Sequence, residues 1–123
     1  TDGVWVYMGS PLPGNQPRHE YTLMPMRHGG RRAFINNEVL RTMRLRKPFS
    51  FTKEIPVLKL ESTAWISQAE YPTMLFCLKE DPMELNPVEN EDQEQRMIEL
   101  MKKMMKANNC PKEQFVRMGL SFA

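Results

Sequence analysis

Hydrophobic and polar positions follow two different periods along the chain, and these periods predict strands in the first two thirds and helices after them. Short apolar and aromatic runs, which are typical of strands, occupy residues 3–8, 21–24, 55–60, 63–66 and 73–78. The first run is apolar on both faces, which predicts a central position in a sheet. The polar stretch between the last two runs favours a hairpin connection. We therefore expect about four antiparallel strands.

The region 91–108 has the most regular helical pattern. Asn90 with Gln93 three residues later forms a capping-box pattern. Acidic residues follow in the first turn and lysines in the last turn, as the helix dipole favours. One stripe of the helix is apolar and is expected to pack on a sheet: Met97, Ile98, Met101, Met104 and Met105, with Leu100 at its margin.

Two shorter helices are also predicted. One covers residues 38–45, since Asn37 can cap its first turn and Pro48 stops it. The other covers residues 111–119, because proline suits a helix start and glycine a helix end. This pattern predicts an α+β fold, a small antiparallel sheet packed against a C-terminal amphipathic helix. A chain of 123 residues with 41% hydrophobic residues can form one core, which predicts a single domain over residues 1–123.

Charge is distributed unevenly, although the net charge is only +2. Residues 27–47 contain seven Lys or Arg and one acid, whereas residues 80–99 contain eight acids and one Arg. This asymmetry predicts two faces of opposite sign. No apolar run approaches the length of about 20 residues that a membrane span needs, so we expect no membrane segment. The two cysteines lack the CxxC spacing of a zinc or redox site.

The segment 75–86 runs from an apolar strand into an Asp-Pro-x-Glu-x-Asn turn. It resembles the C-terminal signature of the alkaline-phosphatase-like sulfatases, which is close to Leu-Tyr/Phe-Asp-Leu-x-x-Asp-Pro-x-Glu-x-Asn. Cys77 departs from it, since the family usually has Asp at that position. The matching residues are Leu75, Phe76, Leu78, Asp81, Pro82, Glu84 and Asn86. The resemblance to a bacterial subset of this family continues through residues 96–101, 111–115 and 117–120, and more weakly through 21–25 and 48–53.

The resemblance implies a non-catalytic C-terminal portion of a larger sulfatase, a sulfuric ester hydrolase. Sulfatases use a formylglycine made from a Cys/Ser-x-Pro/Ala-x-Arg motif, and a divalent metal, expected to be calcium, held by the N-terminal domain. Neither Cys77 nor Cys110 stands in that motif, so we assign no catalytic residue, metal ligand or cofactor to this chain. The implied partners are the N-terminal catalytic domain of the parent and, through it, an anionic sulfate ester. The chain would complete the fold and border the substrate cleft.

Arg27, His28, Arg31 and Arg32 lie in a glycine-containing loop and are the candidate substrate-binding residues. Each guanidinium can donate two parallel charge-assisted hydrogen bonds to a sulfate or carboxylate. The resemblance implies that loops of this subdomain border the cleft. The alternative is a stand-alone binding or interaction module that uses residues 27–32 for an anionic partner such as nucleic acid. We do not expect nucleic acid, because aromatics are not interleaved with these charges and residues 80–99 would repel phosphates.

Several other residues have both a functional and a structural interpretation. Asp81, Glu84 and Asn86 could act as metal ligands, but their spacing around Pro82 favours a turn in which a side chain bonds a nearby backbone N–H. Methionines in the helical stripe favour core packing over copper binding. Cys77 is expected to be a buried, inert thiol on the strand.

Overall fold

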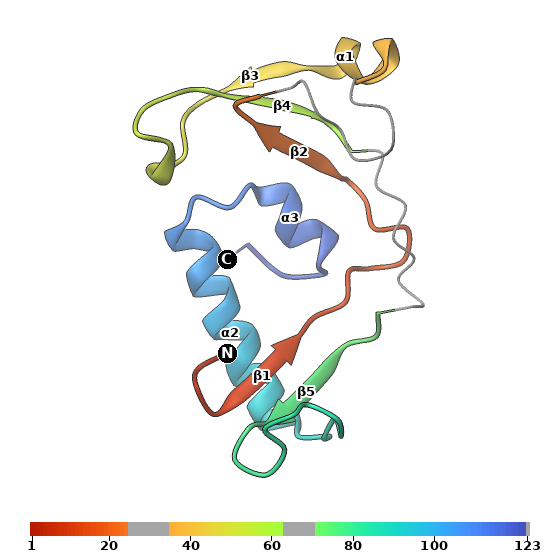
Figure 1. Ribbon diagram of the computed structural model, residues 1–123, viewed down its shortest axis with the longest axis vertical. Helices are drawn as coiled ribbons and strands as arrows, with labels where there is room; N and C mark the ends of the chain where they lie inside the picture. Colours follow the sequence, from red (N-terminus) through yellow and green to blue (C-terminus); the bar gives the residue numbers. More distant parts are fainter. Residues whose placement is uncertain (25–34, 63–70, 123) are drawn as a thin grey trace. The chain divides into compact units, whose positions relative to one another are not determined.

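The computed structural model describes residues 1–24, 35–62 and 71–122 (Figure 1). Strands and helices are both present, and the strands pair antiparallel, which confirms the predicted α+β class. The strands lie in two sheets of two and three strands, however, and not in the one sheet expected. The chain forms two compact units, Thr1–Gln16 with Ser67–Ala123 as unit 1, and Pro17–Ile66 as unit 2.

Unit 1 contains the two-stranded sheet. β1 (Trp5–Met8) pairs antiparallel with β5 (Met74–Cys77), and Tyr7 stands opposite Leu75. The predicted strands 3–8 and 73–78 are thus confirmed. The hairpin partner expected for β5, residues 63–66, lies outside the described residues.

The expected central position of β1 is wrong for the described part of the chain. The sheet there has two strands, and the other edge of β1 is occupied by the N-terminal turn. Trp5 N–H donates to Asp2 Oδ1 at 2.7 Å, and Asp2 N–H donates to Trp5 O at 3.3 Å. A local turn therefore satisfies the N–H and C=O of Trp5, which a further strand could have paired.

The long helix α2 (Glu91–Ala107) packs against β1 and confirms the predicted element (Figure 1). Asn90 caps it, with Oδ1 accepting from Gln93 N–H at 3.0 Å. The buried stripe differs from the expected one. Met97 is buried, but Met104 is 61% exposed. Met97, Met101 and Met105, which lie four positions apart, are buried or half-buried, whereas the exposed Met104 lines a hollow with Met101 and Tyr7.

Both helices of the C-terminal region end in the same way. After α2, Cys110 N–H donates to Met105 O at 2.8 Å. After α3 (Lys112–Arg117), Leu120 N–H donates to Phe115 O at 2.8 Å, and Gly119 has a φ of 68°. These six-to-one bonds across a left-handed residue satisfy terminal carbonyls. The second C-terminal helix is therefore confirmed over a shorter range.

Unit 2 contains the three-stranded sheet in the order β2 (His19–Thr22), β4 (Val57–Glu61), β3 (Arg44–Arg46). Short helices α1 (Asn37–Thr42) and η1 (Ser50–Thr52) flank it (Figure 1). Its buried apolar side chains are Val39, Phe49, Val57 and Leu60.

The predicted helix 38–45 is only partly correct. Its cap is Asn36, whose Oδ1 accepts from Val39 N–H at 2.8 Å, and not Asn37. The helix ends at Thr42, and the next residues form β3 because Leu45 pairs with Leu58 of β4. An Arg-Leu-Arg alternation fits a strand as well as a helix, so backbone pairing with β4 decides the outcome.

Candidate functional site

The four predicted substrate-binding residues, Arg27, His28, Arg31 and Arg32, lie outside the described residues. Their role in binding an anionic substrate remains a prediction. The described residues instead contain three features that could take part in binding: the turn after β5, a hollow in unit 1, and a face of the sheet in unit 2.

The residues that resemble the sulfatase signature form a closed turn between β5 and α2. Asp81 Oδ2 accepts a hydrogen bond from Asn86 N–H at 2.6 Å, and Asp81 N–H donates to Cys77 O at 2.8 Å. Val88 N–H donates a hydrogen bond to Leu75 O at 2.8 Å, which closes the turn against β5. The predicted turn is thus confirmed, and the Asp81 carboxylate is engaged in holding it.

Side chains of His, Cys, Asp and Glu are the ones that most often hold a metal ion. Within residues 1–24, 35–62 and 71–122, no group of three or more His, Cys, Asp or Glu is arranged to hold a metal ion. Cys77 is buried, as predicted, and is a free thiol.

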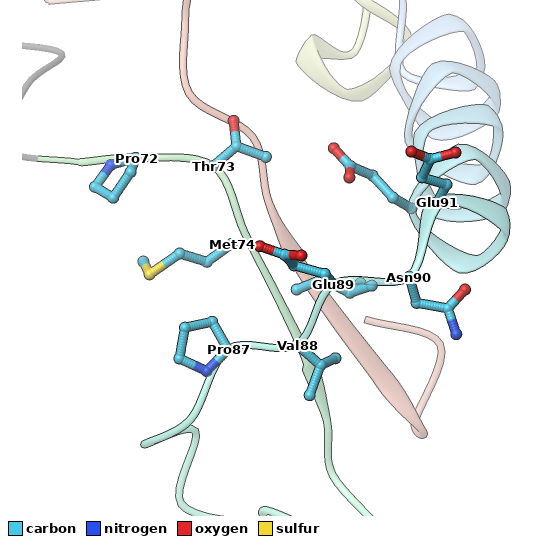
Figure 2. A pocket seen from close by; sticks show the side chains of 10 residues that line it. Pro72, Thr73, Met74, Pro87, Val88, Glu89, Asn90 and Glu91 are labelled. Carbon is cyan, nitrogen blue, oxygen red and sulfur yellow. The ribbon is translucent and has the colours of Figure 1, made fainter.

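A hollow of about 490 Å³ lies in unit 1 between β5 and the start of α2 (Figure 2). The side chains of Pro72, Met74 and Pro87 line one side of it, and Glu91 lies on the other side where α2 begins (Figure 2). Its lining also includes two further carboxylates, Glu89 and Glu94.

The electrostatics of this hollow are unsuitable for an anion. Three glutamates line it, and none of its lining residues is a Lys or Arg. Burial first, and the charge of Glu94 second, raise the pKa of the Tyr7 hydroxyl above 10.0. A sulfate group would be repelled at this position.

Unit 2 has a face with the opposite character. The pairing of β2, β4 and β3 places Tyr21, Lys59 and Arg44 in one row, with Arg46 in the next. The Arg46 guanidinium carbon lies 4.5 Å from the Phe49 ring centroid and 5.3 Å from that of Tyr21. Two rings thus hold one guanidinium on the sheet.

Further groups extend this arrangement, which we call the cation–aromatic face and define as Tyr21, Arg44, Arg46, Phe49, Phe51 and Lys59. The Phe51 ring stacks on Phe49 with centroids 5.2 Å apart and planes at 4°. Phe51 is 66% exposed. The Lys59 ammonium lies 5.9 Å from the Tyr21 ring centroid. The face brings cationic side chains and an exposed aromatic ring together. The Arg44 guanidinium already donates to Arg41 O at 3.0 Å and to Met43 O at 2.7 Å.

Sequence reasoning missed this face. Its aromatic and cationic members are separated by up to 38 positions, from Tyr21 to Lys59, and only strand pairing brings them together. The one local signal was the alternation of Arg44 and Arg46, which places both on one side of a strand. That signal is hidden because Arg44 falls within the helix predicted over residues 38–45.

Comparison with protein-family models, curated proteins and solved structures gives no significant match for this chain. Among the described residues, no helix is both long enough and apolar enough to cross a membrane.

Proposed function

We propose that this chain is the non-catalytic C-terminal portion of a sulfatase, a sulfuric ester hydrolase, and that it completes the fold of the parent and borders its substrate cleft. The observation that carries the proposal is the closed turn from Leu75 to Val88. The sequence of that turn resembles the family signature. Its Asp81 carboxylate accepts a hydrogen bond from Asn86 N–H, and Asp81 N–H donates to Cys77 O. Such a signature has a structural role, as expected for a part that supports a catalytic domain.

Other observations support a non-catalytic role for this chain beside a catalytic N-terminal domain. The signature residues Leu75 and Phe76 are buried, at 4% and 3% exposure, and anchor the turn in unit 1. Both cysteines lie outside the Cys/Ser-x-Pro/Ala-x-Arg motif. The nucleophile and the metal ligands would therefore come from the N-terminal domain of the parent, with formylglycine and calcium supplied there.

An assay of 4-nitrophenyl sulfate hydrolysis tests the proposal, with calcium present. The chain alone should show no turnover, whereas the chain joined to the polypeptide encoded immediately upstream should hydrolyse the ester. A matched control is the joined protein with Phe76→Asp, which buries a carboxylate in the anchor of the turn and should abolish turnover by unfolding. Turnover by the chain alone, after removal of contaminating enzyme, would exclude the proposal.

A further inference from the structure

The hollow of unit 1 is an open groove with an apolar lining, formed by Pro72, Met74, Pro87 and Val88 (Figure 2). Much of this lining is accessible. Pro72 and Pro87 are exposed, and Val88 is 36% exposed. Tyr71, which precedes the groove in the chain, is 57% exposed. Apolar side chains that gather around an open hollow are typical of a surface that binds another molecule.

The walls of this groove are held in place by the chain's own hydrogen bonds. Asp81 Oδ2 accepts from Asn86 N–H at 2.6 Å and closes the turn that leads into the groove. Val88 N–H donates to Leu75 O at 2.8 Å. Asn90, also in the lining, caps α2 through its bond from Gln93 N–H. Little ordering of this chain would therefore be needed when a partner binds.

The groove also borders the outer edge of β5. Among the described residues, β5 has a strand partner on its β1 side alone. Leu75 O points away from β1, since it accepts from Val88 N–H, and the backbone groups of Thr73 point the same way because they alternate along a strand. Thr73 N–H and C=O have no partner in residues 1–24, 35–62 and 71–122. An extended segment can pair with such an edge.

The charge of the groove selects the kind of segment. Glu89, Glu91 and Glu94 line it, and none of the three has a cationic partner in the described part of the chain. Residues 80–94 contain seven acids and no Lys or Arg, so no cation of this stretch offsets them. The charge complement of the groove is therefore a cation.

The position of these carboxylates favours Lys or Arg side chains over a metal ion. No group of three or more His, Cys, Asp or Glu within the described ranges could hold a metal. Glu91 instead lies across the groove from Pro72, Met74 and Pro87 (Figure 2). A Lys or Arg side chain fits this arrangement, because its stem packs on apolar residues while its charged end reaches a carboxylate.

We infer that this groove docks an extended segment of a partner protein in which Lys or Arg side chains stand beside apolar ones. The lining along β5, from Pro72 to Leu75, is about 13 Å long at a strand's rise, which suits three or four residues of such a segment. The inference goes beyond the proposed function and does not depend on it, since it uses neither a nucleophile nor an upstream domain.

Fluorescence anisotropy with the full 123-residue chain tests the inference. The probe is a fluorescein-labelled peptide in which lysines alternate with valines, in about 50 mM salt. Two control peptides replace either the lysines by glutamates or the valines by serines. The lysine–valine peptide should bind, the glutamate–valine peptide should not, and the lysine–serine peptide should bind more weakly because it lacks apolar contacts.

The triple variant Glu89→Gln/Glu91→Gln/Glu94→Gln should weaken binding of the lysine–valine peptide by about tenfold. The matched control, Glu38→Gln/Glu54→Gln/Glu80→Gln, makes the same charge change at exposed positions outside the groove and should alter the affinity by less than about twofold. If circular dichroism shows that the groove variant is unfolded, Glu89→Gln, which precedes α2, carries the same test against Glu80→Gln.

Four results would overturn the inference. Equal losses for the groove and control variants would show that the peptide binds elsewhere, and equal binding of the lysine and glutamate peptides would exclude charge recognition. Displacement of the peptide by an equal concentration of spermidine would make a small organic cation the ligand. Self-association of the original chain in sedimentation, lost in the groove variant, would make a second copy the occupant.

The outcome is separable from that of the proposed function. Peptide binding is measured on the chain itself and needs no turnover. A chain that confers sulfate ester hydrolysis when joined to its upstream part, but ignores the lysine–valine peptide, refutes the inference alone. A chain that binds the peptide through its glutamates, but confers no turnover, refutes the sulfatase proposal alone.

Discussion

Asp2 and Arg96 form an ion pair although they are 94 positions apart, and this pair ties the N-terminal turn to the long helix α2. The same Asp2 carboxylate accepts hydrogen bonds from Val4 N–H at 2.9 Å and Trp5 N–H at 2.7 Å. One side chain thus closes the turn, bonds the Trp5 N–H at the start of β1 and connects that strand to α2.

The Asp2 network predicts a pH dependence of stability. The bond from Trp5 N–H, then the bond from Arg96, lower the pKa of Asp2 well below 3.8. A carboxyl group whose pKa is lower in the folded state contributes stability above its unfolded pKa and loses that contribution as the pH falls. Urea unfolding of the original protein and of Asp2→Asn should therefore differ most near pH 6, and the difference should shrink toward about pH 3. A difference that stays constant over this range would contradict the network.

The corrected stripe of α2 predicts unequal effects of methionine truncation. Met97 is 5% exposed, so Met97→Ala should lower the free energy of unfolding by about 3 kcal/mol through lost packing and a cavity. Met104 is 61% exposed, and Met104→Ala should change it by less than about 0.5 kcal/mol. Urea unfolding of both variants measures the difference. Equal losses would support the stripe expected from sequence instead.

Asp81 is expected to stabilise the turn after β5 through its bond to Asn86 N–H. Asp81→Ala removes this acceptor and should lower the free energy of unfolding by about 1 kcal/mol. The neighbouring Glu80 is exposed, so Glu80→Ala serves as the charge-matched control and should be nearly neutral. Chemical unfolding of the two variants provides the comparison, and a neutral Asp81→Ala would remove the structural role assigned to the signature.

A kinetic prediction for the parent enzyme concerns Arg27, His28, Arg31 and Arg32. Their joint substitution by Ala should raise KM for an anionic sulfate ester, since guanidinium donors would be lost, and should change kcat less. Steady-state kinetics of the joined protein test this, with a thermal melt as the control for folding. Unchanged KM would remove these residues from the cleft.

Local signals predicted the elements that depend on local interactions. Asn90 and the acidic first turn were enough to place α2, and Gly119 was enough to place the end of α3. The position of β3 was missed because its conformation depends on pairing with β4, whose residues lie more than ten positions away. The cation–aromatic face was missed for the same reason, since no local pattern relates Tyr21 to Arg46.

The central claim, that this chain supports the catalytic domain of a sulfatase, is tested most directly by mass spectrometry of the polypeptide encoded immediately upstream. The account predicts a Cys/Ser-x-Pro/Ala-x-Arg motif there, and a peptide in which its first residue has become formylglycine, with a lower mass than an unmodified cysteine. An upstream polypeptide without that motif, or with the motif unmodified in an active enzyme, would contradict the account.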